Sequence, residues 1–154
     1  MADGALFEDI DAVGERQREI DVLFGEEVLD YMGEIAHAAI DAGADIVIGH
    51  GPHYSLPVEV YRGKPISYGL GSFSFHTGHG GRQHGDWIGM MVRIEIGLAG
   101  IAAAEFRFVR HNAANETVPC ALAAEGATFD RVVAKSVPLG ASLTPEGDWV
   151  RVAL

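Results

Sequence analysis

The chain has 154 residues, of which 22 are acidic and 11 are basic, and its formal net charge is −11. This length predicts one domain, and a hydrophobic fraction of 48% is sufficient for a core and argues against disorder. The negative charge repels phosphate backbones and anionic lipids, so we expect neither nucleic acid nor a membrane surface as a partner.

Residues 1–25 are polar and acidic with weak patterning, and we predict a weakly ordered lead-in to a domain that covers residues 26–154. The first stretch, MADGALFEDIDAVGER, lacks the basic and apolar regions of a signal peptide. The chain also contains no apolar run that approaches the ~20 residues needed to span a bilayer. These features predict a soluble, cytoplasmic protein.

Residues 26–42 show helical spacing of apolar side chains, and Gly43 supplies a stop signal. The next residues, 44–48, read ADIVI and predict a strand that is buried on both faces, as in a parallel sheet. A helix, a tight glycine turn and a buried strand form an αβ unit, in which ligands bind beyond the carboxyl end of the strand.

Residues 58–61 and 65–68 flank the sequence Arg-Gly-Lys and predict a β-hairpin, which Tyr61 and Tyr68 are expected to pack. The glycines of the following segment, GLGSFSF, indicate backbone crowding or a bulge. We expect three side chains of this segment to be buried: Leu70, Phe73 and Phe75.

The remaining chain alternates strands with turns and one helix. Residues 76–86, HTGHGGRQHGD, are rich in glycine and histidine and predict a loop. Strands are expected over residues 87–96, 101–110 and 149–153, and a short helix over residues 127–136. The elements together predict an α/β fold of the mixed α+β kind.

Two histidines, His50 and His53, follow the predicted strand 44–48. Gly49 and Gly51 let the backbone turn sharply, and Pro52 stiffens the approach to the second histidine. Imidazole is a common ligand of divalent metals, so a metal site is one interpretation of this loop. The other is a turn with two exposed histidines. Two histidines are too few for a dinuclear centre, which requires carboxylate or amide ligands as well.

The loop HTGHGGRQHGD is the second candidate site. Its glycine amides can surround phosphate oxygens, and Arg82 can bind an anion through two hydrogen bonds. We expect Arg82 to hold a substrate anion and His84 to transfer a proton, whereas His76 and His79 receive no definite role. The alternative is a solvated loop without function.

Four other polar residues are expected to be structural. His37 lies on the polar face of the predicted helix and His111 follows a strand in a polar turn, so both are expected in solvent. Asp45 is expected to cap or hydrogen-bond the neighbouring loop. Cys120 is the only cysteine, which excludes an internal disulfide, and it is expected to be a small packing residue without a charged partner.

The sequence DAGADIVIGHGPH, followed by EVYRGKPISYGLGSFSF, resembles the C-terminal signature of the CapA-type poly-γ-glutamate (capsule) biosynthesis family. That family is similar to the calcineurin-like metallophosphoesterases, and the resemblance covers residues 26–76. It implies an αββα sandwich with a mixed sheet and β-hairpins, and a metal-dependent phosphoesterase-type hydrolase. It places His50 and His53 at the last metal-ligand motif, for a divalent ion (Mn, Zn, Fe or Mg), and implies a small anionic or phosphorylated substrate.

The sequence departs from the family at several positions. Gly51 replaces the middle histidine of G-H-H-P-H, and Gly69 and Ser72 replace the serine and asparagine of Y-S-L-G-N-F. The family's upstream Asp, Asn-Leu-Glu and Asn-His ligands do not occur in residues 1–25, where Leu23-Phe24-Gly25 stands in place of a His-Trp-Gly segment.

These departures predict the C-terminal portion of such a domain, incomplete as a catalyst and missing an N-terminal half. The alternative is a non-catalytic domain that has lost its activity and self-associates as a homodimer, because strand 44–48 would otherwise expose an unpaired edge.

Overall fold

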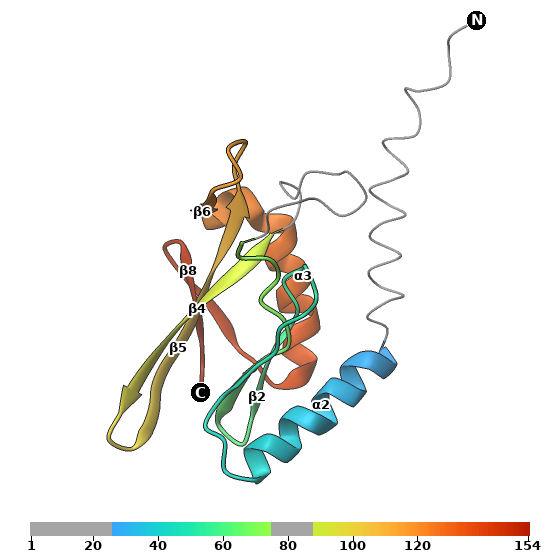
Figure 1. The fold of residues 1–154 in the computed structure, drawn as a ribbon. Helices are drawn as coiled ribbons and strands as arrows, with labels where there is room; N and C mark the ends of the chain where they lie inside the picture. Colours follow the sequence, from blue (N-terminus) through green and yellow to red (C-terminus); the bar gives the residue numbers. More distant parts are fainter. Residues whose placement is uncertain (1–25, 75–87) are drawn as a thin grey trace, which may run out of the picture. The chain divides into compact units, whose positions relative to one another are not determined.

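The computed structural model describes residues 26–74 and 88–154 (Figure 1). The chain forms two compact units, residues 1–35 and residues 36–154. In the first unit the described residues begin helix α2 (Glu26–Asp41), on which Tyr31 and Ile35 are exposed. The predicted lead-in, residues 1–25, lies outside the described residues.

Helix α2 ends where the sequence predicts. The Gly43 N–H donates to the Ile40 carbonyl at 3.0 Å, and Gly43 has a φ of +110°, a conformation that favours glycine. In the second unit Ala36 and Ile40 are buried, with 3% and 7% of their surface exposed. The C-terminal part of α2 therefore packs through small and aliphatic side chains.

A three-stranded sheet follows α2, with the order β1 (Val47–Ile48), β3 (Lys64–Ser67) and β2 (Val58–Tyr61). Strands β1 and β3 are parallel, and β2 and β3 form the predicted antiparallel hairpin. The two residues of its turn, Arg62 and Gly63, have φ of 51° and 72°. Left-handed φ at both positions is typical of the tight turn that matches the twist of a hairpin.

Strand 44–48 was predicted to be buried on both faces, and this is wrong. Regular pairing covers only Val47 and Ile48, and Ile48 is 49% exposed. The physical reason is position: β1 pairs with β3 on one side and, among residues 26–74 and 88–154, has no strand on the other. It is an edge strand of the described sheet.

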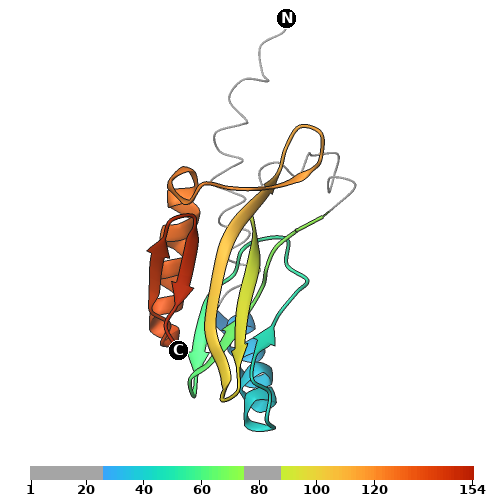
Figure 2. The same cartoon turned by 90° about the vertical axis from the view of Figure 1, so that its left-hand side faces the viewer.

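The chain from residue 88 onward builds a five-stranded antiparallel sheet, with the order β4-β5-β8-β7 and β6 paired to β5. Its members are β4 (Gly89–Gly97), β5 (Gly100–His111), β6 (Thr117–Pro119), β7 (Leu143–Glu146) and β8 (Trp149–Val152). Figure 2 shows the long β4–β5 hairpin. The strands predicted over residues 87–96, 101–110 and 149–153 are confirmed as β4, β5 and β8 within the described residues; β6 and β7 were not predicted.

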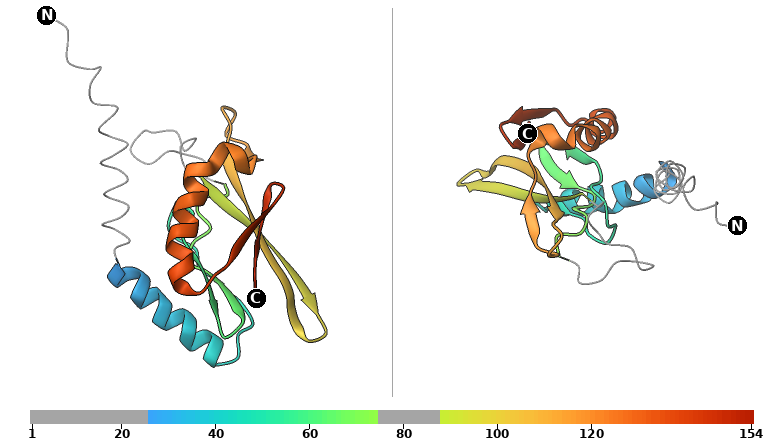
Figure 3. Two further views of the ribbon diagram at one scale, coloured as in Figure 1. Left: turned by 180° about the vertical axis from the view of Figure 1, so that it is seen from behind. Right: turned by 90° about the horizontal axis from the view of Figure 1, so that it is seen from above.

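The predicted helix over residues 127–136 is confirmed as α3 (Gly126–Ser136), flanked by two 3-10 turns, η3 (Leu122–Glu125) and η4 (Val137–Leu139). The left view of Figure 3 shows α3 lying against the strands, and α3 contacts β2. The Ser136 hydroxyl accepts a hydrogen bond from the Val58 N–H at 2.9 Å and so ties α3 to β2. In the part of the chain that the structure describes, no helix is long and apolar enough to cross a bilayer.

The core lies between the two sheets and α3. The Phe106 and Phe108 rings meet edge to face at 5.6 Å, both with 1% of their surface exposed. Aliphatic side chains from the other elements surround them: Val58, Met90, Val132, Val150 and Val152. Helices and mixed sheets around one core confirm the predicted mixed α+β class.

Paired charges lie across the five-stranded sheet. Glu105 on β5 is opposite Arg93 on β4 and Arg151 on β8, and its carboxylate accepts from both guanidinium groups, at 2.7 Å from Arg93 Nε and 3.1 Å from Arg151 Nη2. The Arg93 guanidinium also lies 4.2 Å from the centre of the Trp149 ring. Glu105 is 7% exposed because these longer side chains cover it.

Candidate metal site

The loop that carries the two histidines turns at glycines, as the sequence predicts. The Gly49 N–H donates to the Ser67 carbonyl at 2.6 Å, and a Cβ on Gly49 would lie 2.8 Å from the carbonyl carbon of Tyr68 and overlap its oxygen. Gly51 has a φ of +130°, which side chains rarely adopt. Two glycines thus fix how the chain leaves β1.

The two histidines differ in their surroundings. His50 is exposed, whereas His53 is half-buried, and its Nδ1 lies 2.8 Å from the hydroxyl of Ser72, which is 5% exposed. A second group on one ring nitrogen of a histidine sets the ring orientation and assigns metal ligation to the other nitrogen. In the sequence, Ser72 is visible only as a departure from the family pattern. The available signal was that serine, like the asparagine that it replaces, can hydrogen-bond.

Two predictions near Ser72 are wrong. Phe73 was expected to be buried, but it is 50% exposed; its backbone carbonyl, not its ring, is held. That carbonyl accepts hydrogen bonds from the Thr117 hydroxyl and, at 3.1 Å, from His111 Nε2. His111 was expected at the surface, but it is 4% exposed because β5 extends to this residue and turns its ring toward residue 73.

His37, expected as a solvated partner on the polar helix face, is 35% exposed and does have partners. Its Nε2 lies 2.6 Å from a carboxylate oxygen of Glu59, and its ring stacks on Tyr61 with centroids 3.8 Å apart. Glu59 is 7% exposed and also accepts from the Tyr68 hydroxyl. Burial, followed by the Glu59 carboxylate, raises the pKa of Tyr68 well above its ordinary value. This cluster ties α2 to the hairpin, and it includes both tyrosines that were expected to pack there.

Asp45 and Cys120 are structural, as predicted. The Asp45 carboxylate accepts from the Lys64 ammonium and so joins the loop before β1 to the hairpin. Cys120 is buried in the core, and burial, together with the Glu125 carboxylate, raises the pKa of its thiol. The expectation that it has no charged partner is wrong, since both Arg110 and Glu125 interact with it.

The described residues test how far a metal fits. The described ranges contain no group of three or more His, Cys, Asp or Glu side chains that could hold an ion. A catalytic zinc site uses three protein ligands, so His50 and His53 would not complete such a site by themselves. The other predicted site residues lie outside the described residues: His76, His79, Arg82 and His84.

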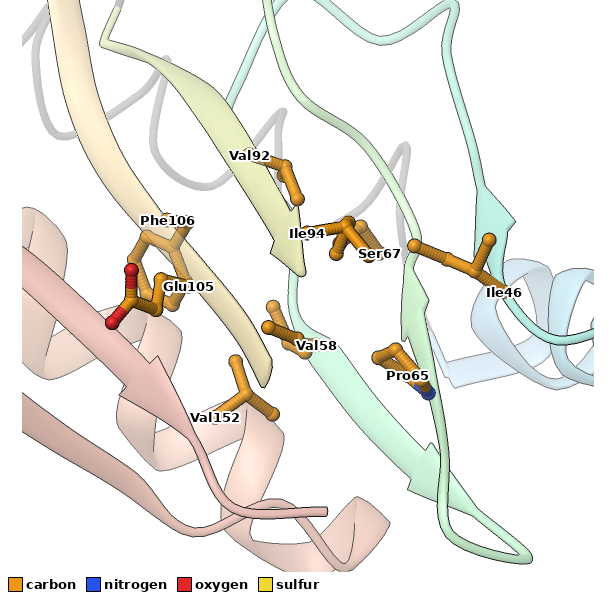
Figure 4. A pocket seen from close by; sticks show the side chains of 10 residues that line it. Ile46, Val58, Pro65, Ser67, Val92, Ile94, Glu105, Phe106 and Val152 are labelled. Atoms are coloured by element: carbon orange, nitrogen blue, oxygen red, sulfur yellow. The ribbon is translucent and has the colours of Figure 1, made fainter. Parts of the chain in front are cut away.

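A small hollow of about 10 Å³, partly open to solvent, lies between the two sheets (Figure 4). Its lining is mostly apolar and includes Val58, Val92, Ile94 and Phe106. Glu105 supplies the only charge in this lining, and its carboxylate is already paired with two arginines. Without convergent polar groups the hollow lacks the features of a ligand site.

Comparison with known proteins matches the histidine-bearing region. Residues 22–77 match the family model described as bacterial capsule synthesis protein PGA_cap. The PGA biosynthesis protein CapA of Bacillus subtilis is 51% identical over 49 residues, which is 32% of this chain and 13% of that protein. A probable polyglutamine synthesis accessory protein of Mycobacterium tuberculosis is also 51% identical over 49 residues, covering 31% and 13%.

The capsule biosynthesis protein CapA of Bacillus anthracis is 48% identical over 44 residues, which is 29% of this chain and 11% of that protein. The matched segment thus spans only about an eighth of the length of these curated relatives. It nevertheless contains β1, the two histidines, the β2–β3 hairpin and Ser72. The predicted resemblance to the CapA-type capsule synthesis family is therefore confirmed for residues 22–77.

Proposed function

We propose that the chain carries the C-terminal, histidine-bearing part of a metal-dependent phosphoesterase-type hydrolase that serves poly-γ-glutamate capsule biosynthesis. The family resemblance supports the biological setting, since the relatives are named for PGA or capsule biosynthesis. The observation that best supports metal binding is the contact between His53 Nδ1 and the Ser72 hydroxyl. It orients a ring directly beyond β1, in the manner of a ligating histidine.

The roles of the residues follow from this contact. His50 and His53 would hold a divalent ion, and Ser72 would keep the His53 ring in position. A bound ion would polarise a phosphoryl oxygen of the substrate and lower the pKa of a bound water. Arg82 and His84 remain the predicted groups for the substrate anion and for proton transfer. Because two imidazoles do not complete a centre, further ligands must come from residues other than those described.

Elemental analysis tests this proposal. The chain is incubated with Zn²⁺ or Mn²⁺, desalted and analysed for metal, beside the variants His50→Ala and His53→Ala. We expect bound metal in the parent chain and its loss in both variants. His37→Gln is the matched control, because it also removes one imidazole but retains a side chain that can donate to Glu59. Equal metal in the parent chain and both alanine variants would overturn the proposal.

The self-associating domain is the second candidate, and the edge position of β1 favours it. Strand β1 pairs only with β3 within the described sheet, and Ile48 at this edge is 49% exposed. A second copy of the chain could pair along this edge and cover the side chain. Light scattering after size-exclusion chromatography would then give a dimer that Ile48→Lys dissociates. A monomeric parent chain would exclude this candidate.

A further inference from the structure

We infer that His111 and Thr117 are positioning residues for His53, acting through the backbone of residues 72–73. This inference rests on the proposed function, and it assigns a role to a region outside the family match, which ends at residue 77. The route has three contacts. His111 and Thr117 bond to the Phe73 carbonyl, Ser72 is the preceding residue, and the Ser72 hydroxyl contacts His53 Nδ1.

The two donors are placed together by strand register. His111 ends β5 and is the direct partner of Thr117 on β6, so their side chains lie on the same face of the antiparallel pair. Both reach one oxygen, and a carbonyl oxygen has two lone pairs with which to accept two hydrogen bonds. The end of this β-ribbon thus forms a clamp on the Phe73 carbonyl.

The same segment is held on the other side of Ser72. The Met90 N–H donates to the Leu70 carbonyl at 2.6 Å. A Cβ on Gly71, whose φ is +71°, would lie 2.9 Å from the Gly89 Cα. Ser72 therefore lies between two backbone anchors, one from the start of β4 and one from the β5–β6 clamp.

The clamp matters because the Phe73 side chain is only half-buried, so it holds the segment less firmly than a core side chain would. The Phe73 side chain is half-exposed, whereas Ser72 is 5% exposed, so the backbone contacts determine where the Ser72 hydroxyl points. When His53 Nδ1–H donates to that hydroxyl, Nε2 carries the lone pair that a metal requires. Loss of the clamp would let the hydroxyl move and would weaken this preference.

The experiment uses variants of Thr117, which is less buried than His111. Thr117→Val removes the donor at nearly constant shape, and Thr117→Ser restores it. Zn²⁺ affinity and the His53 ring signals in long-range ¹H–¹⁵N spectra are measured for each. We expect Thr117→Val to weaken Zn²⁺ binding by about 3- to 10-fold, at or below the usual range for groups that support a metal ligand, and to shift the His53 ring nitrogens. Thr117→Ser should restore both values.

His111 gives an independent arm. His111→Gln retains a donor and should keep the His53 signals, whereas His111→Leu should shift them; thermal unfolding of each variant shows whether it folds. A purely structural clamp would lower the unfolding temperature and leave the ring signals unchanged. The inference is overturned if Thr117→Val leaves the His53 ring signals unchanged and the Zn²⁺ affinity within twofold of that of the parent chain.

The failure of this inference can be distinguished from the failure of the proposed function. The ring signals are recorded without metal, so they report positioning even if no metal binds. If His53→Ala binds Zn²⁺ as the parent chain does, the proposed function fails. If His53→Ala loses Zn²⁺ but the clamp variants leave the ring and the affinity unchanged, only the positioning role fails.

Discussion

Residues 44–74 and the antiparallel sheet of residues 88–154 are stabilised in different ways. In the first region backbone approaches backbone, and Gly49 and Gly71 stand where a Cβ would overlap a neighbouring main chain. In the second, large side chains fill the core and paired charges cross the sheet, as around Phe106 and Glu105. The histidine-bearing region thus depends on close backbone approach, and part of its support, the contact of Gly71 with Gly89, comes from outside the family match.

The largest expected effect comes from adding one methyl group in the first region. In Gly49→Ala the new Cβ would overlap the Tyr68 carbonyl, so the strands at the site must separate. We expect a loss of about 3 kcal/mol or more in the free energy of unfolding, measured by urea denaturation.

The matched control lies in the second region. Gly126 begins α3 with a φ of −53°, and a Cβ there would contact nothing within 4 Å. Gly126→Ala should leave the stability unchanged or raise it by up to about 1 kcal/mol. Equal losses in the two variants would remove the distinction between the regions.

A smaller effect is expected from the buried carboxylates. Glu59→Leu removes the acceptor of the buried Tyr68 hydroxyl and of His37, and should lower the free energy of unfolding by roughly 2 kcal/mol, measured by thermal or urea unfolding.

A still smaller loss is expected from Arg93→Ala, which removes one of the two arginines paired with Glu105. It should lower the free energy of unfolding by about 0.5 kcal/mol, because the Arg93 side chain is 58% exposed. The Arg93 effect should also shrink at high salt. A cost for Arg93→Ala that matches the cost for Glu59→Leu would contradict this ranking.

The smallest expected effect is a pH dependence from Tyr68. Its pKa is raised in the folded state by burial and by Glu59, so the folded chain holds this proton more tightly than the unfolded chain. The stabilisation is complete below about pH 10, the ordinary tyrosine pKa, and is lost as pH rises through the folded pKa. Between pH 9 and 11 the free energy of unfolding should therefore decrease more steeply with pH for the parent chain than for Tyr68→Phe. Parallel slopes would show that this proton is not linked to folding.

Much of the fold could be predicted from local patterns. The spacing of apolar residues and the positions of turn residues predict four features: helix α2 with its glycine stop, the β2–β3 hairpin, the β4–β5 pair and α3. The exposed edge of β1 could not be predicted, because ADIVI reads as buried whichever neighbours the strand has. His37 and His111 were placed in solvent for a similar reason: their partners, Glu59 and the Phe73 carbonyl, lie 22 and 38 residues away in sequence.

The candidate site divides in the same way. The position of His50 and His53 beyond a strand was predictable from GHGPH, and so were the glycine turns beside them. The Ser72 contact was not, since 19 residues separate it from His53 and only the folded hairpin brings them together. The clamp of His111 and Thr117 depends on the register of β5 and β6, and β6 itself was not predicted.

The most direct test of the account is a Zn²⁺ titration of the ¹⁵N-labelled chain, followed through the ring nitrogens of its histidines. We expect the His50 and His53 rings to respond together, with one midpoint and at lower Zn²⁺ than His37 or His111. Separate midpoints for His50 and His53, or a response no earlier than that of His37, would contradict it.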